Sequence, residues 1–244
     1  VVAVASPNKE INQDDVERVI EAARAISLSS EQEIIHVIPK DFKVDSQEGI
    51  KDPVGMTGVR LESEAHLITG LSTALKNMEK CILDLGIQVD GFIFSGLASA
   101  SVVISETEKE LGVAVIDIGA GSTSLCVYVD GSLEYSAALP VGARHITQDI
   151  ALGCKVSLDS AEKIKIALSK EAFSPITPIA GESKQDFNRR KDVADKLKLS
   201  DFEQTSDVTE SFSKKEIVEK IMLPRMQEIF SLVGEKLKKI YWHK

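Results

Sequence analysis

The sequence predicts an α/β protein made of two subdomain layers. Apolar strands alternate with amphipathic helices along most of its 244 residues, which is longer than a single average domain. In the second half, a buried strand ending at Asp117 runs straight into a glycine turn and a second apolar strand, which indicates a hairpin. Because 43% of the residues are hydrophobic but only 5% are aromatic, we expect an aliphatic core.

Residues 1–69 predict a small α+β module in the order strand, helix, strand, strand. Asn12 can cap the helix, and Asp14 and Asp15 suit the positive end of its dipole. Apolar side chains recur at helical spacing from Val16 onward. The strands are expected at residues 1–5, 34–44 and 59–68, with a loop over 49–58.

Residues 70–112 predict helices around one further strand. A helix is expected after Gly70, with its apolar side chains along one side. These side chains are Leu71, Leu75, Met78 and Ile82. A strand at 89–94, a short helix at 97–104 and an acidic surface loop at 106–110 should follow.

Residues 113–155 predict a three-stranded meander followed by a helix. The glycine turn separates the first strand, which begins at Val113, from a second strand at 125–129. Asp130-Gly131 is a strong hairpin signal between the second strand and a third at 133–139. Pro140 to Gly142 then lead into a helix that should start near His145.

Residues 156–244 predict two helices on either side of a polar segment. Ser157 caps the first helix, whose buried face is Leu158, Ile164 and Leu168. The segment 171–211 has weak periodicity, so an exposed helix at 184–198 and a variable insertion are both compatible with it. Ser213 and Glu216 form a capping-box pair at the start of a long helix, which Pro224 should kink.

The turn after Asp117 has the chemistry of a phosphate site. Gly119 and Gly121 let the chain turn with bare backbone amides, and we expect a positive φ at both. Successive bare amides form a concavity that suits phosphate oxygens, to which Ser122 and Thr123 can donate from their hydroxyls. Asp117 can hold a magnesium ion through water. An ordinary tight hairpin explains the same glycines, so both interpretations stay open on the motif alone.

Composition and motif patterns exclude several other functions. No helix opens after the glycines and no Gly-Lys-Ser follows, so the turn is neither a Rossmann fingerprint nor a P-loop. A net charge of −9 without a basic stripe argues against nucleic-acid binding. The three cysteines and four histidines lack the spacing of a disulfide framework or a metal site. No apolar run reaches about 18 residues, so no membrane span is expected.

Several stretches of the sequence carry a family resemblance. They are residues 15–24, 35–39, 47–56, 58–61, 97–100, 117–123 and 162–165. The chain resembles the FtsA family of actin-like bacterial cell-division proteins. The resemblance implies an actin-like ATPase core of ribonuclease H-like topology with the α+β module added at its N-terminal side. It assigns residues 1–69 to subdomain 1C, 70–112 to part of 1A, 113–155 to 2A and 156–244 to 2B.

The resemblance also implies a site for ATP and magnesium. It places the phosphates on Gly119, Ala120, Gly121, Ser122 and Thr123, with Gly142 nearby and Asp117 at the metal. It places the adenosine near Glu162 and Lys165, which lie three residues apart on a helix and therefore share a face. The same spacing is also explained by a solvated ion pair on the surface of the helix. Arg225 becomes a candidate contact for the C-terminal tail of FtsZ, and an exposed helical arginine is the alternative.

The implied function is assembly in cell division. In its full-length form such a protein polymerises, links FtsZ filaments of the Z ring to the membrane, and hydrolyses ATP slowly or not at all. It works in the cytoplasm, at the inner face of the membrane at the division site. The family's first phosphate loop, its Gly-Gly-Gly adenosine loop and its amphipathic membrane anchor have no match here, so we expect a central fragment. A PilM-like type IV pilus adaptor and a sugar or metabolite kinase are the alternatives.

Overall fold

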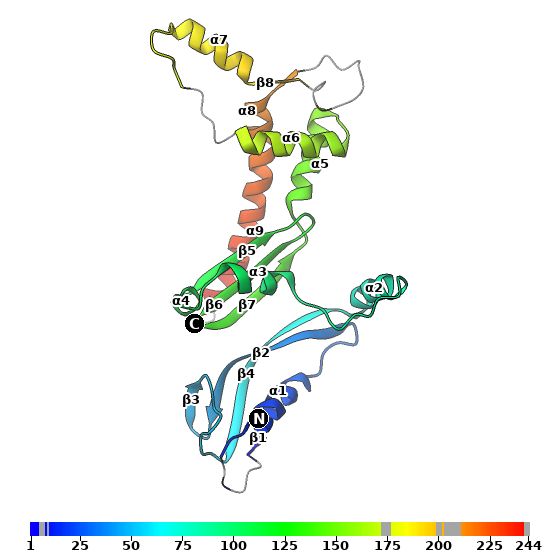
Figure 1. The fold of residues 1–244 in the computed structure, drawn as a ribbon, viewed down its shortest axis with the longest axis vertical. Coiled ribbons are helices and arrows are strands. Elements are labelled where there is room, and N and C mark those ends of the chain that lie inside the picture. The colour runs from blue at the N-terminus through cyan, green and yellow to red at the C-terminus, as the bar shows by residue number, and fades with distance from the viewer. Residues whose placement is uncertain (5–7, 9, 172–176, 199–201, 203–210, 242–244) are drawn as a thin grey trace. The chain divides into compact units, whose positions relative to one another are not determined.

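A computed structural model describes residues 1–4, 8, 10–171, 177–198, 202 and 211–241, and it divides into two units (Figure 1). The first unit consists of residues 1–117 and 124–137, and the second of residues 118–123 and 138–244. Parts of the expected strand at 1–5 and of the polar segment 171–211 lie outside the described residues.

The N-terminal module of the first unit is a four-stranded sheet with a helix packed on it. Its strands β1 (Val2–Ala3), β2 (Gln32–Val44), β3 (Gln47–Ile50) and β4 (Arg60–Leu71) lie in the order β1-β4-β2-β3. Helix α1 (Gln13–Arg24) starts at Asn12, which forms a reciprocal capping box with Asp15. Ile11, Val19 and Leu61 are almost fully buried in one core cluster of this module. The expected helix and the two long strands are confirmed, and β3 is an addition that ends inside the expected loop.

Two expectations between residues 70 and 112 are wrong. Residues 89–94 form no strand, and the Phe94 amide instead donates to Nε2 of His36 at 3.0 Å. Residues 106–110 belong to helix α4 (Glu106–Leu111), because Ser105 and Glu108 form a capping box that starts a helical turn. The expected helix at 97–104 is confirmed as α3 (Ser95–Val103).

Helix α2 (Ser72–Leu83) follows Gly70 as expected, and its apolar side is not buried. No residue of α2 is buried, and Leu71 and Met78 are both more than half exposed. The apolar periodicity therefore predicted the helix correctly. Among the described residues, however, no other element buries the apolar side of this helix.

The meander is confirmed as strands β5 (Val113–Ile118), β6 (Thr123–Val129) and β7 (Ser132–Leu139), in the order β5-β6-β7. Asp130 and Gly131 both have positive φ, at 50° and 77°, as a two-residue hairpin of right-handed twist requires. Gly142 then caps helix α5 (Ala143–Cys154), close to the expected start.

The core of the second unit lies among α5, helix α6 (Leu158–Glu171) and the long C-terminal helix (Figure 1). Ile150, Ile164 and Ile217 are buried there. Ser157 caps α6, since its Oγ accepts from the Ser160 amide at 3.2 Å. Leu158 was expected in the core but is half exposed.

The long helix begins at Ser213 and includes a π turn. It runs through α8 (Lys214–Ile217), the π segment η2 (Val218–Met222) and α9 (Leu223–Tyr241). The Leu223 amide reaches back five residues to the Val218 carbonyl directly before Pro224, which has no N–H to donate. The expected irregularity at Pro224 thus takes the form of a π turn.

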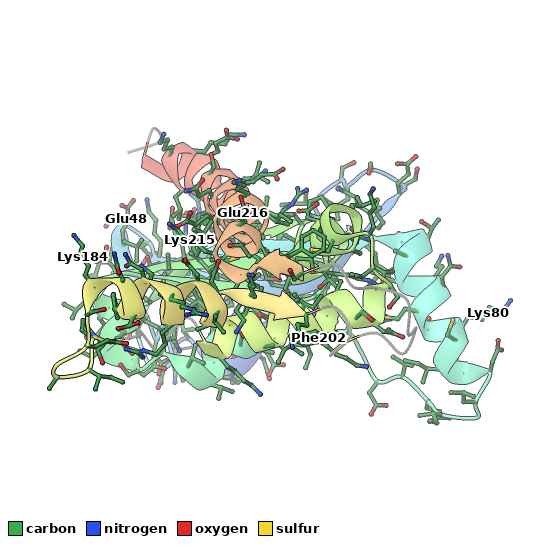
Figure 2. All side chains as sticks on the ribbon, turned by 90° about the horizontal axis from the view of Figure 1, so that it is seen from above. Glu48, Lys80, Lys184, Phe202, Lys215 and Glu216 are labelled. Carbon is green, nitrogen blue, oxygen red and sulfur yellow. The ribbon has the colours of Figure 1, made fainter. Side chains whose placement is uncertain are left out.

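The described part of the polar segment contains helix α7 (Lys184–Ala194) and the strands β8 (Lys196–Lys198) and β9 (Ser211–Ser213). None of the α7 residues is buried. Figure 2 shows Lys184 at the end of α7 away from β8, and Lys215 and Glu216 on the separate α8 helix. The expected exposed helix is therefore present, although it ends before Lys198.

Candidate functional site

The glycine loop is tied to the start of α5 through its carbonyl groups. The Ala143 amide donates to the Gly119 carbonyl at 2.9 Å, and the Arg144 amide donates to the Ala120 carbonyl at 2.8 Å. Within the loop, the Gly119 amide donates to the Ser122 carbonyl at 2.9 Å. These three bonds fix the path of the loop backbone.

The next three amides of the loop are left for a ligand. Ala120, Gly121 and Ser122 are exposed, and their amides have no backbone partner among the described residues. Three consecutive free donors on a loop whose carbonyls are held from behind make a cradle for an anion. The structure thus gives the loop the polarity that a phosphate site needs.

Gly142 makes the attachment to α5 possible. A β-carbon at this position would lie 2.5 Å from the Gly119 carbonyl oxygen and 2.7 Å from that of Ala120. Real β-carbons do not approach backbone oxygens so closely, so any other residue would push α5 away from the loop. Glycine is required here by close approach.

The expected positive φ at Gly119 and Gly121 is wrong. Neither is among the glycines with positive φ in the described residues. A β-carbon at Gly121 would meet no atom within 4 Å, and one at Gly119 would lie 3.1 Å from the Ser122 carbonyl. Because the loop carbonyls are held by α5, the turn closes without left-handed backbone.

The hydroxyl of Thr123 does not face a ligand. It is fully buried and donates to the Val141 carbonyl at 2.7 Å. The expectation that it donates to phosphate is therefore corrected, because its proton already joins the start of β6 to the segment before Gly142. Ser122 remains exposed.

Asp117 is positioned by a serine that the sequence analysis did not select. The Ser99 hydroxyl on α3 donates to Asp117 Oδ2 at 2.9 Å. Asp117 Oδ1 has no hydrogen-bond partner among the described residues, so it can accept from a water of a hydrated cation. No sequence signal pairs these two residues, because 18 positions separate them.

Glu162 and Lys165 face each other and join α6 to α5. Glu162 Oε2 accepts from Lys165 Nζ at 2.7 Å and from the buried Thr147 hydroxyl at 2.6 Å. Lys165 Nζ also lies 3.0 Å from the Thr147 hydroxyl oxygen and 3.5 Å from the Ala143 carbonyl. The pKa of Glu162 is lowered because Lys165 and then Thr147 donate to it.

The ion pair on the helix, which was the alternative interpretation of the spacing, is thus present. Thr147 is a third member of this group that the sequence analysis did not select. Thr147 lies between the buried apolar residues Ile146 and Ile150. A polar residue on the buried face of a helix is the sequence signal that could have identified it. The Ala143 residue that Lys165 approaches is the one whose amide holds the glycine loop. The predicted adenosine-side pair and the predicted phosphate loop therefore meet at the N-terminus of α5.

Arg225 lies in a separate pocket of about 350 Å³ between α5 and the long helix. Its guanidinium makes a two-pronged contact with Asp149, at 2.7 and 3.0 Å, and a third with Glu228 at 2.5 Å. The remaining lining residues are Leu152, Lys220, Ile221 and Pro224. About one quarter of the Arg225 side chain is exposed, so Arg225 is held by its ion pair with Asp149 and still reaches the pocket surface.

The described residues lack two kinds of feature. They contain no group of three or more histidine, cysteine or acidic side chains arranged to hold a metal. They also contain no helix that is both long and apolar enough to cross a membrane.

Comparison with known families identifies both halves of the chain. Residues 1–69 match the family described as "SHS2 domain inserted in FTSA", and residues 114–234 match "Cell division protein FtsA". The chain belongs to the FtsA family. This assignment favours FtsA over the pilus adaptor and the kinase, and the actin-like fold that the resemblance implied is that of this family.

Several curated FtsA proteins are similar to this FtsA-family chain. The one from Borreliella burgdorferi is 47% identical over 166 residues, 68% of this chain and 40% of the relative. The one from Bacillus subtilis is 43% identical over 199 residues, 78% of this chain and 45% of the relative. The Escherichia coli K12 protein is 41% identical over 158 residues, 65% and 38% of the two chains. The matched part is thus less than half the length of these relatives.

Among solved structures, one chain of a PilM-PilN type IV pilus biogenesis complex is 17% identical, with a TM-score of 0.46. The alignment covers 66% of this chain and 46% of that one. This similarity is too low to support an argument about the FtsA-family chain.

Proposed function

We propose that this chain carries the phosphate-binding and assembly parts of an ATP-binding protein of bacterial cell division. The observation that supports the proposal most directly is the loop of three exposed residues, Ala120, Gly121 and Ser122, whose amides have no backbone partner within the described part of the chain. Their carbonyl neighbours are held by α5, so the donors are fixed before a ligand arrives. Fixed donors bind phosphate without a reorganisation cost.

In this proposal Asp117 holds the water shell of a magnesium ion that accompanies ATP. Ser99 fixes one oxygen of that carboxylate and leaves the other free. Glu162 accepts ribose hydroxyls, and the aliphatic stem of Lys165 covers the adenine face. In this proposal ATP hydrolysis is at most slow, because the nucleotide mainly sets the closure of the two lobes.

The wider role proposed is that of an FtsA protein. The module of residues 1–69 joins neighbouring copies, and the pocket around Arg225 receives the C-terminal tail of FtsZ. The protein acts at the inner face of the cell membrane at the division site. No nucleic acid is involved, in keeping with the net charge of −9.

Hydrogen exchange of the full-length protein with and without ATP and magnesium tests the nucleotide site. We expect ATP to slow exchange of the amides at 120–122 at least tenfold, because phosphate oxygens take their protons. The hairpin turn at Asp130 and Gly131 serves as a control that ATP should leave unchanged. Saturating ATP without protection of 120–122 would move the phosphate site elsewhere.

A further inference from the structure

A line of polar side chains joins the SHS2 module, residues 1–69, to strand β7. Lys40 Nζ on β2 lies 2.8 Å from Glu134 Oε2 on β7 and 2.9 Å from Glu64 Oε1 on β4. Only 15% of the Lys40 side chain is exposed, so this charge is largely withdrawn from water. Lys40 therefore touches one carboxylate of its own module and one of the neighbouring sheet.

Three further contacts connect the same segments. The Ser132 hydroxyl on β7 donates to the Lys40 carbonyl at 3.0 Å, and Lys51 Nζ lies 2.7 Å from that hydroxyl. His66 Nε2 on β4 lies 2.8 Å from the Ser136 hydroxyl. Ser132, Glu134 and Ser136 alternate along β7, so they lie on one face of the strand.

Apolar packing lies beside this polar line. Ile38 and Ile68 of the module belong to the same core cluster as Tyr128 and Leu133 of the meander. Such packing favours association but has no preferred direction, because the hydrophobic effect follows buried area. Directional contacts must therefore set the angle and register at which the module sits on the strand.

We propose that Lys40 is a latch whose bond to Glu134 fixes the position of the SHS2 module on β7. Glu64 makes the latch reversible. When the bond between Lys40 and Glu134 breaks, Glu64 still neutralises Lys40. Breaking this bond therefore does not leave a buried ammonium without a partner. The module can thus change its angle on the sheet at a cost of one ion pair and not of an orphaned charge.

The pKa of Lys40 agrees with this arrangement. Burial alone would lower this pKa, but the hydrogen bonds that Lys40 donates to Glu134 and Glu64 raise it above its ordinary value. Lys40 therefore stays charged throughout the neutral range, and salt is the variable that should weaken the latch.

Two matched variants of the 244-residue chain test the proposal. Glu134→Gln removes the bond across to β7, whereas Glu64→Gln removes a bond of almost equal length inside the module. Hydrogen exchange is measured for peptides that cover residues 36–42 and 132–137. We expect Glu134→Gln to speed exchange there about threefold, the scale of a partly exposed ion pair, while Glu64→Gln leaves it within error.

Salt provides a test that needs no variant. Raising sodium chloride from 0.05 M to 0.5 M should move the wild-type exchange of both peptides toward that of Glu134→Gln and leave Glu134→Gln itself unchanged. Equal effects of the two variants, or wild-type exchange that ignores salt, would overturn the latch. Neither readout involves nucleotide or filaments, so the result is independent of the proposed function.

Discussion

Gly142 faces Gly119 so closely that a β-carbon on the first would lie 2.5 Å from the carbonyl oxygen of the second. That oxygen accepts the Ala143 amide, so helix α5 and the glycine loop share one rigid junction. The geometry of the three amides at 120–122 depends on this junction, because two backbone hydrogen bonds from α5 hold the carbonyl groups of Gly119 and Ala120.

Gly142→Ala should damage both stability and nucleotide binding. The added methyl must push the loop or the helix aside, which we expect to cost about 1–3 kcal/mol of unfolding free energy, as overpacking does. ATP affinity in the full-length protein should fall at least tenfold by titration calorimetry. Gly234→Ala is the control, since a β-carbon there meets no atom within 4 Å. Unchanged affinity in a folded Gly142→Ala variant would separate the junction from the site.

Asp117→Asn should weaken ATP binding mainly when magnesium is present. A neutral amide is a poor acceptor for the water shell of a hard cation, so the loss with magnesium should exceed the loss in EDTA by about tenfold. The comparison is made by titrating ATP with and without magnesium. Equal losses in both conditions would make Asp117 a structural residue of the turn.

Ser99→Ala should show a smaller version of the same difference, because it frees Asp117 without removing its charge. Ser99→Thr keeps the hydroxyl and should restore magnesium dependence. A Ser99→Ala protein that binds like the wild type in both conditions would remove Ser99 from the positioning role.

Arg225→Met should lower the affinity of the protein for an FtsZ tail peptide about tenfold, a loss of roughly 1.4 kcal/mol. Fluorescence anisotropy of the labelled peptide gives the measurement. Asp149→Asn is the informative partner, since it weakens the internal hold on Arg225 but keeps the guanidinium. It should bind at least as tightly as the wild type. If both variants lose affinity equally, Arg225 supports the α5 contact and does not meet the peptide.

Acid should destabilise the first unit through two histidines. Burial lowers the pKa of His36, and burial followed by the charge of Lys40 lowers that of His66, against a smaller opposing effect of Glu134. The unfolded chain then takes up protons near pH 6.5, before the folded chain does. The free energy of unfolding should therefore fall as pH drops below about 6.5, and this loss should stop below the folded pKa values.

Urea unfolding at pH 7.5, 6.5 and 5.5 measures this loss. The His36→Asn/His66→Asn double variant should have a shallower dependence on pH over that range, because its folded and unfolded states no longer differ at these two positions. A double variant with the wild-type slope would assign the acid sensitivity to other groups.

Local sequence signals determined most of the secondary structure. Asn12 begins α1, Asp130-Gly131 closes its hairpin, and Gly142 leads into α5, because caps and turns depend on a few adjacent residues. The position of the glycine loop after Asp117 could likewise be predicted from the order of strand, acid and glycines.

Tertiary structure decided what each element and side chain contacts. Residues 89–94 have strand composition, yet a strand needs a hydrogen-bonded neighbouring strand, and the Phe94 amide donates to the His36 ring instead. The hydroxyl of Thr123 turned inward to Val141, and the requirement for Gly142 arose from a backbone 22 and 23 positions earlier in the sequence. Periodicity and turn chemistry act over a few residues, whereas burial and pairing depend on atoms that are distant in the sequence.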